Sequence, residues 1–177
     1  MSTASAPQPA REPQPTPPAR LDDLLALDTT TLAALYRDAS VPAVPDLSGD
    51  LRGRMLAWEG VRGPVAAALR ALASSAAFPW RGKSFAHDDG AFGQGKNRVF
   101  SDKLRLFRFT TRAGQSRAGD FDAVQLDYDH AENPRFIRAI KDEVRELRPG
   151  LWLGQAWLQW SPAAAPRLVL WFGLEKP

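Results

Sequence analysis

The sequence contains no cysteine, and this absence excludes several kinds of chemistry at once. Disulfide bonds, thiolate metal sites and cysteine nucleophiles all need the missing side chain. A hydrophobic core must therefore hold the fold together, and 177 residues are enough to bury one. The absence of cysteine also suits a reducing compartment.

Long apolar runs are missing as well. No stretch of about 18 consecutive apolar residues occurs, so the sequence predicts no membrane-spanning helix. Residues 1–20 lack the apolar centre of a secretory signal peptide. From these two observations we expect a cytoplasmic protein.

Charge of one sign is not concentrated anywhere in the chain. The net charge is +3, but the basic residues are spread along the sequence and form no block. Proteins that bind nucleic acid usually gather basic residues on one face. We therefore expect no nucleic-acid partner, and the oligomeric state stays open.

The N-terminal segment, residues 1–20, is rich in proline, glutamine and alanine and has no bulky apolar side chain. Such a segment cannot bury enough surface to offset the entropy of ordering, so we predict a disordered tail. An alternative is an arm that recruits a proline-recognising partner, although a solvated tail is favoured. Residues 21–177 are predicted to form a single domain.

Three segments have the features of helices. Residues 21–40 carry leucines at helical spacing, and residues 64–76 begin with a proline at the first helical position. After Asn133 and Pro134, five apolar residues recur at helical spacing and charged residues alternate with them, which predicts an amphipathic helix. These apolar residues are Phe136, Ile137, Ile140, Val144 and Leu147.

The C-terminal half also has strand patterns. Val124, Leu126 and Tyr128 alternate with polar residues, and residues 104–111 form another candidate strand. The segments 151–160 and 167–175 flank a short connection and predict an antiparallel hairpin. The last strand has apolar side chains on both faces, which indicates a barrel covered by helices. We therefore predict an α+β fold: an antiparallel lipocalin-like β-barrel, or a strongly curved sheet, with flanking helices.

Two segments before these strands are expected to be irregular. Residues 78–85, FPWRGKSF, are read as an irregular aromatic segment, and residues 87–98 as a glycine-rich loop. Lys83 lies among aromatic side chains, where it would hold an acidic head group or, if desolvated, act as a base. Packing of its stem against Trp80 is the simpler alternative. Lys96, Asn97 and Arg98 form a candidate anion-binding corner with Lys83.

Common catalytic motifs are absent, so no cofactor is predicted. No P-loop, dinucleotide fingerprint or G-x-S-x-G sequence occurs. The two histidines, His87 and His130, lack the spacing of a metal site, and no metal is predicted. Asp127 and His130 are candidate acid–base groups together with Lys83, although Asp residues before a helix start are common for structural reasons.

Several motifs together resemble one family. They are LSGDLRGRML, the W-x-G-K-x-F block of Trp80, Gly82, Lys83 and Phe85, Tyr128-Asp129, the segment after Asn133, and LGQAWLQW with LVLWFGLE. They resemble small lipocalin-like (calycin-type) proteins that join a G-x-W-x-G type motif to a C-terminal domain of unknown function. Leu51 stands where the family motif has tryptophan. The resemblance implies a calycin-like barrel with flanking helices and a central pocket, and it implies no particular activity.

The first functional hypothesis is non-catalytic binding of a small, mostly apolar ligand with an acidic head group in the barrel. The residues predicted to bind it are Trp80, Lys83, Arg98, Tyr128, Trp152, Trp157, Trp171 and Phe172. The alternative is a cofactor-free lyase, isomerase or cyclase in which Lys83, Asp127 or His130 transfers protons.

Overall fold

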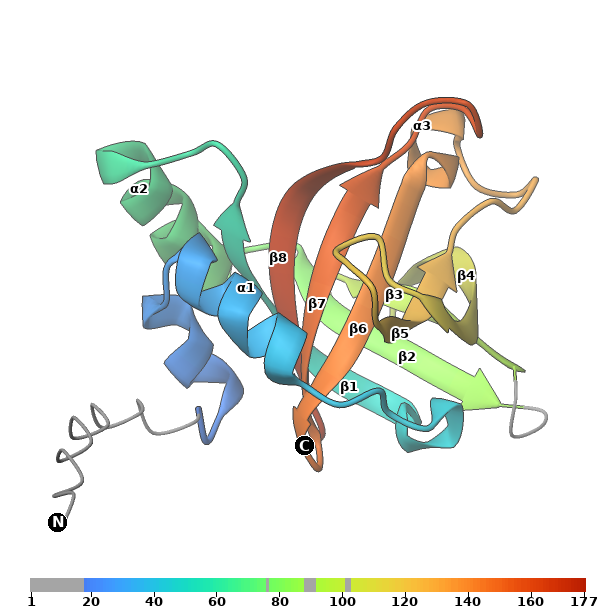
Figure 1. Cartoon of the computed structure of the whole chain (residues 1–177), viewed down its shortest axis with the longest axis horizontal. Coiled ribbons are helices and arrows are strands. Elements are labelled where there is room, and N and C mark those ends of the chain that lie inside the picture. The colour runs from blue at the N-terminus through green and yellow to red at the C-terminus, as the bar shows by residue number, and fades with distance from the viewer. Residues whose placement is uncertain (1–17, 76, 88–91, 101–102) are drawn as a thin grey trace, which may run out of the picture.

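Alternating apolar and polar residues along the strands produce a closed barrel. The computed structural model describes residues 18–75, 77–87, 92–100 and 103–177. Within them, eight antiparallel strands pair in chain order, and β8 returns to pair with β1 (Figure 1). The strands are β1 (Gly49–Trp58), β2 (Trp80–His87), β3 (Phe92–Val99), β4 (Arg105–Gln115), β5 (Asp122–Asp127), β6 (Ile140–Arg148), β7 (Leu151–Leu158) and β8 (Arg167–Glu175). The predicted barrel with flanking helices is confirmed, and so is the C-terminal hairpin.

Short helices flank the barrel. They are η1 (Leu21–Ala26), α1 (Thr29–Asp38), η2 (Val44–Asp46), α2 (Gly63–Ser74) and α3 (Arg135–Arg138). The side chain of Asp28 accepts a hydrogen bond from the Thr31 amide at 2.7 Å, which caps the start of α1. The helical predictions for residues 21–40 and 64–76 are confirmed, the first as two helices and the second as α2.

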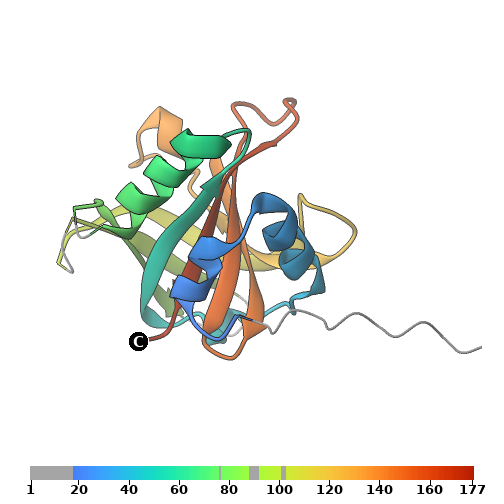
Figure 2. The ribbon, with the colours of Figure 1, turned by 90° about the vertical axis from the view of Figure 1, so that its left-hand side faces the viewer.

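The outer face of the barrel carries a second hydrophobic core. Helices η1 and α1 lie against one side of the barrel (Figure 2), and leucines of both pack on outward side chains of β1, β7 and β8. Trp171 of β8 meets Tyr36 of α1 edge to face, with 5.9 Å between ring centroids. Apolar residues on both faces of β8 therefore reflect two separate cores, one inside the barrel and one under the helices.

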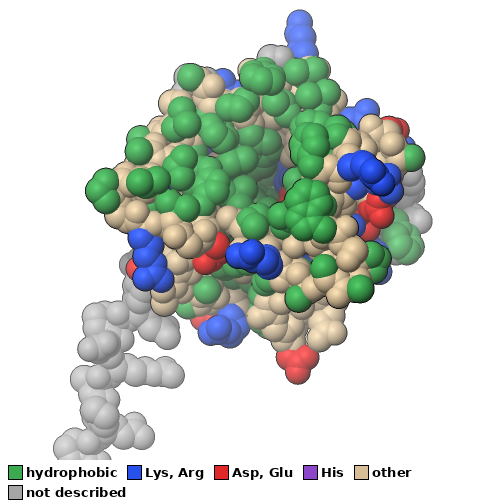
Figure 3. Space-filling model, turned by 90° about the horizontal axis from the view of Figure 1, so that it is seen from above, with side chains coloured by type: hydrophobic (Ala, Val, Ile, Leu, Met, Phe, Trp, Pro, Cys, Tyr) green, Lys and Arg blue, Asp and Glu red, His purple; other side chains and the backbone are tan. Residues whose placement is uncertain are grey.

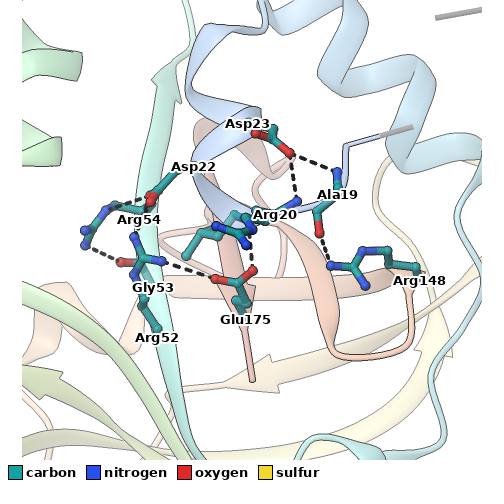
Figure 4. A network of polar contacts seen from close by, with 10 residues as sticks. Ala19, Arg20, Asp22, Asp23, Arg52, Gly53, Arg54, Arg148 and Glu175 are labelled. Atoms are coloured by element: carbon teal, nitrogen blue, oxygen red, sulfur yellow. Dashed lines mark hydrogen bonds and ion pairs between the residues drawn. The ribbon is translucent and has the colours of Figure 1, made fainter. Parts of the chain in front are cut away.

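Ion pairs and hydrogen bonds fix η1 to the strands that close the barrel (Figure 4). Arg52 of β1 contacts Asp22 of η1 at 2.5 Å and Glu175 of β8 at 3.2 Å. The Leu21 amide donates to Glu175 at 3.2 Å. The network therefore joins the N-terminal helix to both strands at the β1–β8 seam.

The prediction of an amphipathic helix after Asn133 is wrong. Only Arg135–Arg138 are helical, and the chain then continues as strand β6. Ile140 and Val144 are four residues apart, a spacing that fits one face of a helix and also one face of a strand. The intervening position on the inner face is Asp142, whose charge concealed the alternation.

The two segments predicted to be irregular are strands as well. Residues 80–87 form β2, and residues 92–98 lie in β3; residues 88–91 of the predicted loop lie outside the described residues. A Cβ at Gly95 would come within 2.4 Å of the Phe109 ring, so this glycine makes room for a core aromatic. Gly82 has φ +134 at an irregularity of the β2–β3 pairing, where the strand bends.

The predicted tail falls largely outside the described residues, since the structure begins at residue 18. In the described part of the chain, no helix is long and apolar enough to cross a membrane.

Candidate functional site

A cavity opens at one end of the barrel. Seen from above, Figure 3 shows a hollow whose walls are largely hydrophobic side chains. The cavity has a volume of about 250 Å³. It is lined by Met55, Pro79, Trp80, Lys83, Asn97, Val99, Phe107, Tyr128, Ile137, Ile140, Asp142, Ala156, Leu170 and Phe172. All but four of these side chains are apolar or belong to tryptophan.

Those four side chains form one polar cluster, centred on the amine of Lys83. The Lys83 Nζ donates to Asp142 Oδ2 at 2.8 Å, to Asn97 Oδ1 at 3.0 Å and to the Tyr128 hydroxyl at 2.5 Å. Lys83 is only 2% exposed and Asp142 only 4%. A charged pair is therefore held inside the barrel rather than at its surface.

Strand geometry brings the cluster together from four separate segments. Lys83 of β2 and Asn97 of β3 are direct cross-strand partners, so their side chains lie side by side on the inner face. Asp142 lies between Ile140 and Val144 on the inner face of β6. Tyr128 directly follows β5 and crosses the barrel interior to reach the Lys83 amine.

Aromatic rings surround the lysine amine. Its nitrogen lies 5.1–5.6 Å from the ring centroids of four aromatic residues, a distance at which a cation is attracted to the ring face. The four rings are Trp80, Phe109, Tyr128 and Phe172. The Trp80 indole also donates to Asn97 Oδ1 at 3.0 Å, which fixes the orientation of that amide.

Burial shifts the pKa values of two members of the cluster. Desolvation lowers the pKa of the Lys83 amine below its ordinary value, and the Asp142 carboxylate partly opposes this shift. Desolvation raises the pKa of the Tyr128 hydroxyl well above its ordinary value, and the charge of Asp142 raises it further. Tyr128 therefore stays protonated, and the amine releases its proton more readily than an exposed lysine.

The unsatisfied hydrogen-bonding capacity of the cluster lies at Asp142. A lysine ammonium has three hydrogens, and the three contacts of Lys83 use all of them. The second carboxylate oxygen of Asp142, Oδ1, is buried and has no hydrogen-bond donor among the described residues. The unpaired atom of the cluster is therefore a buried acceptor, and no N–H of Lys83 remains free.

The predicted ligand-binding residues separate into two groups. Trp80, Lys83, Tyr128 and Phe172 line the cavity. Trp152 points inward but belongs to the filled part of the core and does not line the cavity. The remaining three lie on the outer face: Trp157 donates to Gln155, Trp171 packs under α1, and Arg98 donates to the Leu51 carbonyl.

The predicted acid–base partners of Lys83 lie elsewhere. Asp127 points outward from β5 and pairs with Lys141 at 2.6 Å. His130 is half-buried in the turn after Tyr128 and does not line the cavity. The carboxylate that contacts Lys83 is Asp142, one of the charged residues expected on the solvated face of the helix predicted after Asn133. Its signal in the sequence is a lone charged residue at an inward position between Ile140 and Val144.

Metal ligands do not gather in the part of the chain that the structure describes. No group of three or more histidine or carboxylate side chains there is arranged to hold a metal ion.

The fold and the cavity define the chain as a closed, lipocalin-like antiparallel barrel with flanking helices. A protein from Thermomonospora curvata, known from its crystal structure, shares this fold with a TM-score of 0.52. The two are 19% identical, and the similarity covers 85% of this chain and 88% of the other. This likeness concerns the fold alone. No protein-family model matches the chain, and no curated protein matches it. Membership of the G-x-W-x-G family therefore stays a prediction.

Proposed function

We propose that the barrel binds a small, mostly apolar molecule whose single polar end reaches the Lys83 cluster. The observation that carries this proposal is a cavity of about 250 Å³ with apolar walls and one polar cluster. Ligand pockets typically combine apolar walls with a few well-placed polar groups that fix orientation. A cavity of about 150 Å³ holds benzene, so this one suits a ligand of about ten non-hydrogen atoms.

The polar end of the ligand is proposed to be a hydrogen-bond donor. The amine of Lys83 is already neutralised by Asp142 and has no free hydrogen, whereas Asp142 Oδ1 has no donor in the described part of the chain. A buried acceptor without a partner costs about 1–3 kcal/mol. Rotation of the Asp142 carboxylate would turn Oδ1 toward the cavity, where the O–H of an alcohol would satisfy it. The acidic head group predicted from the sequence fits this site as a protonated acid.

Calorimetric titration with medium-chain and aromatic alcohols, and with the matching carboxylic acids, tests the proposal. The acids should bind more weakly as the pH rises above their own pKa, because each enters with its proton, whereas the alcohols should show no such dependence. A panel in which no member binds would contradict the proposal.

A matched pair of variants tests whether binding occurs in the cavity. Leu170 lines the cavity, and its neighbour Val169 is 38% exposed on the outer face of the same strand. Leu170→Trp should fill the cavity and abolish binding. Val169→Trp adds a tryptophan on the opposite face and should leave binding unchanged. Equal loss in both variants would place the ligand outside the cavity.

A second candidate function is cofactor-free proton transfer, and one observation favours it. Lys83, Tyr128 and Asp142 are three titratable side chains in mutual hydrogen-bond contact beside an apolar cavity. Such clusters with shifted pKa values are frequent in active sites. The groups proposed to act are Asp142 and Lys83, in place of the predicted Asp127 and His130.

Deuterium exchange separates the two functions. A small apolar ketone is incubated with the protein in heavy water, and exchange next to its carbonyl is followed by NMR. Catalysis predicts exchange that Asp142→Asn abolishes and Asp127→Asn leaves intact. If a set of ketones binds and none of them exchanges, proton transfer is contradicted and only the binding function remains.

A further inference from the structure

Exposed aromatic side chains surround the mouth of the cavity. Phe100, Phe136 and Trp160 are 66%, 58% and 67% exposed. Phe100 directly follows Val99, and Phe136 directly precedes Ile137; both of these neighbours line the cavity. Trp160 lies in the connection between β7 and β8, at the same end of the barrel as α3 (Figure 1). Exposed apolar side chains that gather at one end of a protein indicate a surface that contacts a partner or a membrane.

The short helix α3 joins this aromatic mouth to a cationic groove. Its Ile137 side chain lines the cavity, whereas Arg135 and Arg138 line a groove of about 750 Å³ on the outer wall, which Trp160 also borders. The groove contains five cationic side chains against two carboxylates. They are Arg112, Arg117, Arg135, Arg138 and Lys141, with Asp127 and Asp129.

The carboxylates of the groove do not neutralise it. Asp129 pairs with Arg138 at 2.7 Å, and Asp127 pairs with Lys141 at 2.6 Å. Arg117 pairs with Glu143, which lies behind the groove, at 3.4 Å. Arg135 forms no ion pair with any residue that the structure describes. An excess of positive charge therefore remains beside the exposed rings.

We propose that the mouth end of the barrel docks on an anionic lipid bilayer. Aromatic rings favour the interface between lipid and water, and arginines beside them are attracted to anionic head groups. In this orientation the opening of the cavity faces the lipid, where small apolar molecules accumulate. Only this exchange of ligand with the membrane rests on the proposed binding function; the docking itself does not.

The charge of the surface argues against a second copy of the chain as its partner. A two-fold symmetric contact would bring the same patch of both copies together. Two patches of the same net positive charge would then face each other across the contact, which is unfavourable. An anionic bilayer supplies the complementary charge instead.

Co-sedimentation of the full chain with ligand-free vesicles tests the docking. Binding is expected to vesicles of phosphatidylcholine with phosphatidylglycerol, to weaken with added salt, and to be absent with phosphatidylcholine alone. Replacing Phe100, Phe136 or Trp160 by serine should weaken binding about tenfold, because each ring buries apolar area in the interface. Arg135→Ser and Arg138→Ser should each weaken it about fivefold.

Phe92→Ser is the matched control. Phe92 begins strand β3, whose other end leads to Phe100, and it is 60% exposed. It faces Arg112, the groove residue on the part of β4 that lies away from the mouth. Its replacement should leave vesicle binding unchanged. Equal effects at Phe92 and Phe100, or no binding to anionic vesicles at low salt, would overturn the proposal. Binding that depends on the arginines but not on the rings would also overturn the proposal, since it would indicate a surface that recognises polyanions in general rather than a bilayer.

Two further measurements complete the test. Light scattering without vesicles should show that the protein does not self-associate. If it does self-associate, and Phe136→Ser abolishes this, the patch is a contact between copies and the docking proposal fails. Ligand titration in solution should be unaffected by Phe136→Ser. Docking and ligand binding can therefore fail independently of each other.

Discussion

At the scale of single residues, the most unusual feature is an ion pair inside the barrel. Burying Lys83 and Asp142 removes both from water, and the mutual attraction of such a pair often fails to repay that cost. Contacts with Asn97 and Tyr128 and the surrounding rings offset part of it. A core made only for stability would hold apolar residues at these positions, so the pair is best explained by a function.

Removal of one member of the pair should be strongly destabilising. Lys83→Met leaves the Asp142 carboxylate buried without its cation, and we expect a loss of about 3–5 kcal/mol in the free energy of unfolding. Urea denaturation measures this. Adding Asp142→Leu to Lys83→Met should restore most of the loss, because the double variant buries no charge. A single variant as stable as the original protein would show that the pair is not buried as described.

The two tyrosines provide a pH test, because the sequence has no others. Burial raises the pKa of both Tyr36 and Tyr128 above the ordinary value of 10.0, and a nearby carboxylate raises each further. The folded protein then retains two protons that the unfolded chain releases above pH 10. The stability that these groups contribute is present below that pH and is lost as the pH rises beyond it.

The expected outcome is that no tyrosine ionises while the barrel is folded. Ultraviolet absorbance of tyrosinate should rise only together with loss of the folded circular-dichroism signal, and both tyrosines should ionise in that one step. A tyrosine that titrates near its ordinary pKa with the barrel intact would contradict the buried positions of these two side chains.

At the scale of elements, the sequence predicts the strands with regular alternation and misses those interrupted by the site. Val124 and Leu126 alternate cleanly, and β5 is where the pattern puts it. In β6, Asp142 occupies an inward position that would otherwise be apolar, and the pattern then resembles a helix. In β2, Lys83 has the same effect. The residues that break the pattern are those that form the candidate site.

The bend in β2 depends on Gly82. A Cβ at this position would come within 2.1 Å of the Leu51 carbonyl oxygen, and φ is +134. Gly82→Ala should cost about 3 kcal/mol or more, from backbone strain and steric overlap together.

Gly49→Ala provides the comparison. Gly49 also has a positive φ, of +74, but a Cβ there meets nothing within 4 Å, so only backbone strain of about 1 kcal/mol is expected. Urea denaturation of both variants measures the difference. Equal costs at the two positions would mean that β1 and β2 do not approach each other as closely at Gly82 as described.

At the scale of the whole molecule, the barrel was predictable because both faces of β8 carry apolar residues. It was not possible to predict which of those residues lie in the inner core and which lie under the helices, since the sequence does not indicate which face of a strand meets which layer. Trp171 and Trp157 were therefore assigned to the pocket but lie on the outer face, whereas Trp80 lines the cavity. Lys83 was identified from its aromatic neighbours; its partner Asp142 comes from a distant strand and was missed.

Binding of an apolar molecule beside Lys83 is tested best by an NMR titration of the indole N–H signals with a medium-chain alcohol. Trp80 lines the cavity, and its N–H lies beside the Lys83 cluster, whereas the Trp171 N–H donates to Glu59 on the outside of the barrel. If the alcohol occupies the cavity, the Trp80 signal should show a saturable shift and the Trp171 signal should stay unchanged. A Trp80 signal that stays fixed while the alcohol binds, or a larger shift at Trp171, would contradict binding in the cavity.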